Sequence, residues 1–132
     1  MKKYRLTDET IKINGATLYR IEALKDFSNV KKGDKGGFVQ SEENLSHDGL
    51  CWVYNNAKVF ENAVVSGNAV VSGFATVSGF ATVRRCAIVS RRATVREFAT
   101  ISGFATVSGF ATVRGFATVR GSNIVEGRAL IR

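Results

Sequence analysis

Hydrophobic residues recur at every sixth position of the sequence from Val53 onwards. The chain divides there into thirteen blocks of six residues without an insertion or a deletion, and VSGFAT is the most frequent block. The first position is always Val or Ile, and the fifth is Ala in every block except the one that contains Asn123. A period of six would scatter these residues over all faces of an α-helix, whereas β-branched residues alternating with Gly suit short strands joined by turns. The pattern therefore predicts stacked β coils that share one core.

A different pattern occupies residues 11–24, where apolar and polar residues alternate on both sides of Asn14-Gly15. Alternation predicts half-buried strands, and Asn-Gly is a strong signal for a two-residue hairpin turn. A loop rich in Lys and Gly follows, and Trp52, just before the first block, is expected to plug the end of the core. We expect two parts, an N-terminal hairpin and capping segment in residues 1–52 and a repeat domain in residues 53–132.

The blocks resemble the hexapeptide-repeat family, whose rule is aliphatic, small, any, any, small, any, and the match covers about 60% of the chain. The resemblance implies an all-β fold, a single-stranded left-handed parallel β-helix with three blocks in each triangular coil. Thirteen blocks then make between four and five coils. Left-handedness follows from the family alone, because the general rule for crossover connections favours the opposite hand.

The segments KYRL and GGFVQSEENLS resemble the opening of the YdcK-like proteins, which continue into hexapeptide repeats. These proteins occur in enterobacteria, prophages and phages, so the resemblance implies a phage or prophage accessory protein in the cytoplasm of its host. No signal peptide or membrane-spanning run is visible in the sequence, which agrees with that location.

An acyl-CoA-dependent acyltransferase is one alternative that the family resemblance raises. Acyltransferases of this family generally use a His as general base and a loop that projects from the coils. The single His of this chain, His47, lies outside the repeats in a polar run that suggests a surface residue, and the blocks contain no inserted loop. We therefore lean against an enzyme and expect no catalytic residue and no cofactor, although an acyltransferase-like protein that binds acyl-CoA or a nucleotide stays open.

The formal net charge of +8 lies almost entirely in the repeats. Residues 1–52 contain nine Lys and Arg against eight Asp and Glu, whereas residues 53–132 contain ten against three, and nine of those ten are Arg. Arg suits planar, bidentate contacts with phosphate or carboxylate. Stacking would align these side chains in ladders along the coils, at Arg84, Arg96, Arg114, Arg120 and Arg132.

Phe at the fourth position is the main departure from the family rule. A fourth-position side chain lies at a corner of the coil, where we expect it to be at least partly exposed. Phe80, Phe98 and Phe116 fall at one corner of successive coils, and with the arginines they form the expected partner-binding surface. Exposed aromatic and Arg residues are typical of protein interfaces.

Self-association is expected through the remaining corners and the face between them. The expected oligomer interface consists of Phe74, Phe104, Phe110 and Ile88, and it could build a trimer or a dimer. The two cysteines, Cys51 and Cys86, have no metal-type partners in the sequence, so we expect buried free thiols and no metal site.

These patterns favour a non-catalytic β-helical binding protein that engages and blocks a host protein or ribonucleoprotein, for example a defence complex of the CRISPR type. The anti-defence role rests on the resemblance and the size of the chain, not on a residue. Binding of nucleic acid without sequence preference is the other alternative, because Arg ladders can neutralise phosphates and aromatic rings can stack on bases.

Overall fold

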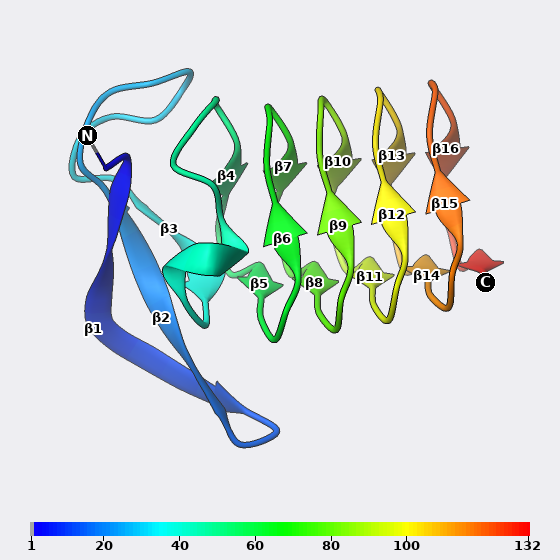
Figure 1. Ribbon diagram of the computed structural model, residues 1–132, viewed down its shortest axis with the longest axis horizontal. Coiled ribbons are helices and arrows are strands. Elements are labelled where there is room, and N and C mark those ends of the chain that lie inside the picture. The colour runs from blue at the N-terminus through cyan, green and yellow to red at the C-terminus, as the bar shows by residue number, and fades with distance from the viewer. Residues whose placement is uncertain (1) are drawn as a thin grey trace.

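The computed structural model describes residues 2–132, which form a β-hairpin packed against the end of a β-solenoid (Figure 1). The N-terminal part contains β1 (Tyr4–Ile13), β2 (Ala16–Ala23), β3 (Lys35–Val39) and a short 3-10 helix η1 (Glu42–Asn44). The solenoid strands are two residues long: β4 (Trp52–Val53), β5 (Lys58–Val59), β6 (Val64–Val65), β7 (Val70–Val71), β8 (Thr76–Val77), β9 (Thr82–Val83), β10 (Ile88–Val89), β11 (Thr94–Val95), β12 (Thr100–Ile101), β13 (Thr106–Val107), β14 (Thr112–Val113), β15 (Thr118–Val119), β16 (Ile124–Val125) and β17 (Leu130–Ile131).

The hairpin forms where the sequence places it. β1 and β2 pair antiparallel, with Ile13 opposite Ala16, so only Asn14 and Gly15 form the turn. Both turn residues have positive φ, 50° and 85°, the conformation that a two-residue type I′ turn requires. The Asn-Gly prediction is therefore confirmed.

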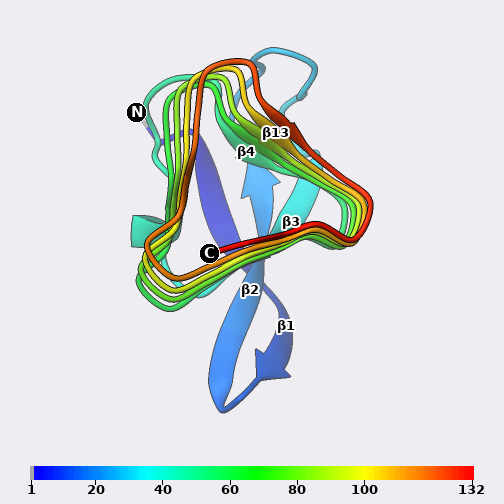
Figure 2. The same cartoon turned by 90° about the vertical axis from the view of Figure 1, so that its right-hand side faces the viewer.

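Three parallel sheets run along the solenoid, one on each face of a triangular prism (Figure 2). Their strand orders are β3-β5-β8-β11-β14-β17, which β1 and β2 extend at one edge, then β4-β7-β10-β13-β16, and β6-β9-β12-β15. Partners are 18 residues apart, as in Val77 with Val95, so three blocks make one coil. Seen from the C-terminal end, the chain runs clockwise as it approaches the viewer, which makes the coil left-handed as the family resemblance implied (Figure 2).

The solenoid begins before the repeat does. β3 pairs in parallel with β5, Leu45 forms a bridge with Val65, and β4 pairs with β7. Residues 35–53 thus make a first, irregular coil, although the sequence placed almost all of them in the capping segment. These residues can form a coil because strand pairing needs only extended backbone and inward aliphatic side chains, not the six-residue rule. With this first coil, the solenoid has about five coils in all.

The interior of the solenoid is a column of aliphatic side chains. The first-position residues from Val53 to Val113 and the Ala residues at the fifth position from Ala57 to Ala111 have no exposed surface. One continuous cluster of buried side chains runs from Tyr4 of the hairpin to Val119 of the fifth coil. Trp52 belongs to this cluster, but its register with Val70 places it on an outer face, where it packs against Phe27 and Tyr4 instead of plugging the interior.

Candidate interaction surface

The phenyl column is a stack of three exposed rings, Phe80, Phe98 and Phe116, at the corner between β8 and β9 and the equivalent corners of the next two coils. Neighbouring ring centroids are 5.1 and 5.0 Å apart, and the ring planes differ by 4° and 6°. The three side chains are 56%, 51% and 82% exposed. Such stacks are favourable but leave one broad apolar edge in water. The structure therefore brings together the three rings that the period predicted at one corner.

Arginines lie on both sides of the phenyl column. Arg96 and Arg114 follow β11 and β14 on the face that leads into the corner, and Arg84 and Arg120 follow β9 and β15 on the face that leaves it. Arg114 is half-buried and the other three are exposed, as is Arg132 after β17. Glu97 lies at the same corner, but its Oε1 accepts a hydrogen bond from the Gly115 N–H at 2.7 Å. The surface around the rings is therefore mainly basic.

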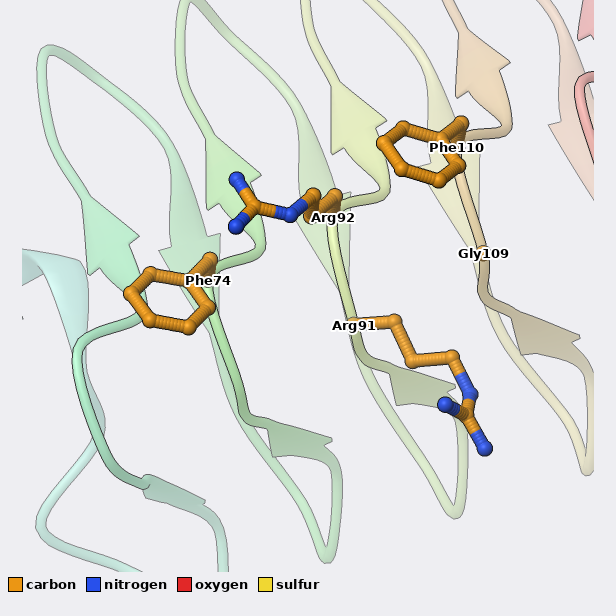
Figure 3. Close-up of a pocket in the computed structure, with 5 residues that line it drawn as sticks. All are labelled: Phe74, Arg91, Arg92, Gly109 and Phe110. Atoms are coloured by element: carbon orange, nitrogen blue, oxygen red, sulfur yellow. The ribbon is translucent and has the colours of Figure 1, made fainter.

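A second corner alternates aromatic and basic side chains. The Arg92 guanidinium lies 4.9 Å from the centroid of the Phe74 ring, and the Arg128 guanidinium lies 5.6 Å from that of Phe110. Both distances are within the range of cation–π attraction. A shallow cleft of about 280 Å³ opens between them, lined by Phe74, Arg91, Arg92, Gly109 and Phe110. Figure 3 shows Arg92 leaning towards Phe74 and Arg91 pointing away, which leaves the near side of Phe110 open.

The face made by β7, β10, β13 and β16 differs from the other two in charge. Its outward side chains are small or apolar, and Glu126 is the single charged residue among them: Val70, Ser72, Ile88, Ser90, Thr106, Ser108, Ile124 and Glu126. Phe104, which is 70% exposed, stands at one border of this face, and the cleft between Phe74 and Phe110 lies at the other. We call it the uncharged face.

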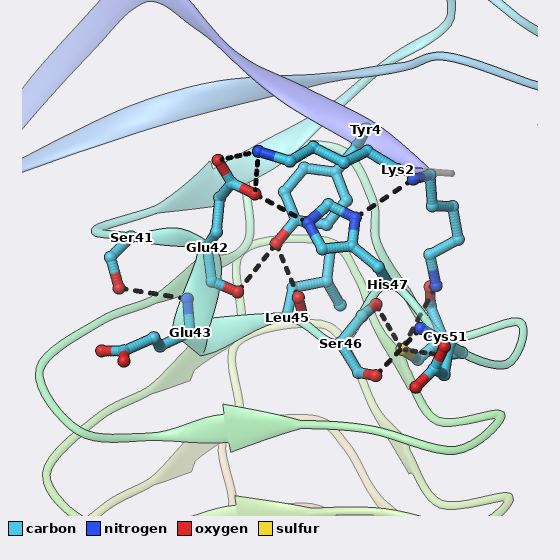
Figure 4. A network of polar contacts seen from close by, with 11 residues as sticks. Lys2, Tyr4, Ser41, Glu42, Glu43, Leu45, Ser46, His47 and Cys51 are labelled. Atoms are coloured by element: carbon cyan, nitrogen blue, oxygen red, sulfur yellow. Dashed lines mark hydrogen bonds and ion pairs between the residues drawn. The ribbon is translucent and has the colours of Figure 1, made fainter.

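His47 takes part in a polar network at the start of the solenoid (Figure 4). Its ring stacks on Tyr4 at a centroid distance of 4.2 Å, and its Nδ1 accepts the Lys3 backbone N–H at 3.1 Å. Its Nε2 lies 2.8 Å from Glu42 Oε1. That hydrogen bond, together with Lys2, lowers the pKa of Glu42. Both ring nitrogens thus have partners within the chain, which leaves neither free to act as a general base.

Lys3 and Cys51 form a buried pair that the sequence does not reveal. The Lys3 ammonium has no exposed surface and donates hydrogen bonds to the Cys51 carbonyl at 2.6 Å and the Cys51 thiol at 3.4 Å. Burial lowers the pKa of Lys3 and raises that of the Cys51 thiol. Cys86 is half-buried at a corner, so the expectation of buried thiols is right for Cys51 and wrong for Cys86.

Within residues 2–132, no three His, Cys, Asp or Glu side chains gather in a way that could hold a metal ion. No helix in that range is both long and apolar enough to cross a membrane. The phenyl column with its flanking arginines, the corner with Phe74 and Phe110, and the uncharged face are the candidate interaction surfaces of the described residues.

Comparison with known proteins gives one local similarity. No protein family profile matches the chain. An uncharacterized acetyltransferase of Escherichia coli (strain K12), YdcK, is 35% identical over 69 residues, which cover 46% of this chain. The chain matches only 21% of that protein's length, so the shared part is about a fifth of the relative. The chain is therefore a β-solenoid with a local similarity to a protein named as an acetyltransferase.

Proposed function

We propose that the protein is a non-catalytic solenoid that binds a partner macromolecule through the phenyl column and the arginines beside it. The observation that carries the proposal is the stack of three exposed rings, Phe80, Phe98 and Phe116. An aromatic edge of this length is costly in water, and aromatic residues with Arg form the centres of protein interfaces. Arg84, Arg96, Arg114, Arg120 and Arg132 supply the charge that attracts an acidic partner.

The partner that we propose is a host protein or ribonucleoprotein whose activity the solenoid blocks, as an anti-defence protein of a phage or prophage would. Support comes from the basic repeats, which contain ten Lys and Arg against three Asp and Glu, and from the YdcK-like opening segment. A long straight row of repeated side chains suits the occlusion of an extended surface better than the binding of one reacting group.

The test is capture of partners from a bacterial lysate by the tagged protein, with variants of matched charge. Reversing both Arg96 and Arg114 to Glu is expected to weaken capture at least about tenfold, because both side chains flank the phenyl column. The control reverses Arg91 and Arg128, which changes the net charge equally at a different corner and should leave capture intact. Equal loss with both pairs would mean that charge alone drives binding and would contradict the proposed surface.

Nuclease treatment and a salt series separate the alternatives in the same experiment. A partner that survives nuclease supports protein binding, whereas complete loss of capture after nuclease would assign the arginines to nucleic acid. An acyltransferase-like function, which the similarity to YdcK favours, predicts instead that acetyl-CoA binds the purified protein by calorimetry. The paired nitrogens of His47 argue against turnover even if acetyl-CoA binds.

A further inference from the structure

The uncharged face has a projecting ring at one border and an aromatic cleft at the other. Phe104 is 70% exposed, and within residues 2–132 no ring packs against it, although Phe80, Phe98 and Phe116 stack on one another. The cleft between Phe74 and Phe110 is lined by these two rings and by Arg91 and Arg92. The Arg92 guanidinium leans towards Phe74 and that of Arg91 points away, so Phe110 is open to another aromatic ring. The exposed Phe104 ring and the cleft between Phe74 and Phe110 therefore lie on opposite edges of the same face.

The heights of the two features along the solenoid also agree. One coil is 18 residues, so Phe104 stands two thirds of a coil beyond Arg92 and one third of a coil before Phe110. With coils ~4.8 Å apart, these offsets are about 3.2 and 1.6 Å. Phe104 is thus level with the gap between Arg92 and Phe110, which Arg92 leaves open by leaning towards Phe74 (Figure 3).

A two-fold axis parallel to the solenoid preserves height and exchanges the two borders of a face. Such an axis would bring the Phe104 border of each copy against the cleft border of the other, so the same contact would form twice. We propose that two copies of this chain form a parallel dimer through their uncharged faces, with Phe104 of each copy inserted in the cleft of the other. Such an interface is isologous, as expected for a closed dimer.

The distribution of charge favours a second copy as the occupant. Each chain has a net charge of +8, so two copies repel least when the centre of the shared surface carries no like charges. The two faces next to the phenyl column contain Arg84, Arg96, Arg114 and Arg120, whereas the uncharged face offers Ile88 and Ile124, which are 40% and 65% exposed. The dimer therefore covers apolar surface and leaves the proposed partner-binding arginines free.

The size of the face sets the strength of the dimer. Four rungs of ~4.8 Å and a side of six residues at ~3.3 Å each give roughly 400 Å² per copy. Stable interfaces bury about 800 Å² per partner, so we expect a dimer with a Kd in the micromolar range or weaker. Arg85 of one copy would approach Arg91 and Arg92 of the other at the rim, and salt should therefore strengthen the dimer by screening them.

Sedimentation equilibrium over a range of protein concentrations tests the dimer. The wild-type chain should associate reversibly to a dimer, and Phe104→Ser should remain a monomer, since Ser122 shows that this corner accepts Ser. The matched control Phe98→Ser removes a ring from the phenyl column and should dimerise as the wild type does. A wild type that stays monomeric, a trimer, or a dimer that persists in Phe104→Ser would overturn the proposal.

Disulfide trapping tests the parallel arrangement. Cys86 lies on the Phe104 border, six residues before Arg92, as Phe104 lies six before Phe110. Arg92→Cys should therefore form a disulfide between Cys86 of one copy and the new thiol of the other under mild oxidation, whereas Arg96→Cys should not. Cross-linking of the wild type through Cys86 alone would indicate antiparallel copies and contradict the parallel dimer. The dimer does not depend on the proposed function, because capture is tested by Arg96 and Arg114 and dimerisation by Phe104.

Discussion

At the scale of single residues, the polar network around His47 joins the opening segment to the first coil. The Lys3 N–H donates to Nδ1, the imidazole stacks on Tyr4, and the Tyr4 hydroxyl donates to the Leu45 carbonyl at 2.6 Å. A backbone donor left unpaired in a partly buried place costs about 1–3 kcal/mol. The one residue that resembles a catalytic base therefore has a structural role.

His47→Ala is expected to lower the free energy of unfolding by about 1–3 kcal/mol, because the Lys3 N–H loses its acceptor and Tyr4 loses its stacked ring. His47→Asn keeps an acceptor oxygen near that N–H and should cost less. Urea denaturation followed by circular dichroism measures both. Equal losses for the two variants would show that the hydrogen bond contributes nothing.

The same network predicts a dependence on acid. The folded-state pKa of Glu42 lies below its unfolded value, chiefly because of the hydrogen bond with His47. Its contribution to stability is therefore complete above the unfolded value of about 4.3 and is lost as pH falls through the folded pKa. Wild-type stability should decline more steeply below that pH than the stability of His47→Ala. If acid denaturation curves showed the same decline for the wild type and for His47→Ala, the His47–Glu42 hydrogen bond would not be the cause of the acid sensitivity.

At the scale of elements, the corner is the part of each block where the backbone conformation most restricts the residue type. The third position of every block has φ near +60° to +70°, and the non-glycine residues there are Asn55, Glu61, Arg85, Arg91 and Glu97. In each case the next coil has Gly at the same corner. Asn55, Glu61 and Glu97 also accept the N–H of that Gly, at 3.0, 2.8 and 2.7 Å. Because Gly follows each of these residues at the same corner of the next coil, their Cβ atoms do not meet a Cβ of that coil. The coils can therefore approach closely.

Gly79→Ala should be far more damaging than Gly121→Ala, although both glycines have nearly the same φ, +70° and +67°. A Cβ on Gly79 would lie 2.7 Å from the Glu97 nitrogen, whereas a Cβ on Gly121 meets nothing within 4 Å. We expect about 1–2 kcal/mol of loss for Gly121→Ala and an additional loss of about 1–3 kcal/mol for Gly79→Ala. Thermal denaturation measures both, and similar losses would show that the close approach of coils is easily relaxed.

At the scale of the whole molecule, the hairpin and the solenoid share one core. The cluster of buried side chains is continuous from Tyr4 through Trp52 to Val119, and β2 and β3 extend a solenoid sheet to the hairpin. An interface of this kind couples the unfolding of the two parts. We therefore expect the chain to unfold as one cooperative unit.

Trp52 is the only Trp of the chain and reports on this junction. Its fluorescence and the far-ultraviolet circular dichroism of the whole chain are expected to change at the same urea concentration. The reason is that the hairpin cannot detach from the solenoid without exposing the shared buried side chains. A fluorescence transition at clearly lower urea would mean that the hairpin unfolds separately.

The repeating part of the molecule could be predicted from the amino-acid pattern together with the family resemblance. A strict six-residue period with Val or Ile first and Ala fifth predicted stacked β coils, and Asn14-Gly15 predicted the hairpin turn. The family resemblance supplied the three blocks in each coil, from which the three faces and the alignment of Phe80, Phe98 and Phe116 followed. Side chains one coil apart must stack when the period contains no insertion. Handedness required the family resemblance, because local propensities do not fix it.

Features outside the six-residue period became apparent only in the folded molecule. The first coil at residues 35–53, the outward burial of Trp52 and the Lys3–Cys51 pair depend on contacts between segments that share no sequence pattern. The lean of Arg92 towards Phe74, and with it the open cleft, depends on side-chain rotation that the backbone period does not specify. Repetition fixes where side chains stand along a solenoid, but nonlocal packing and rotamers decide which of them remain free to bind.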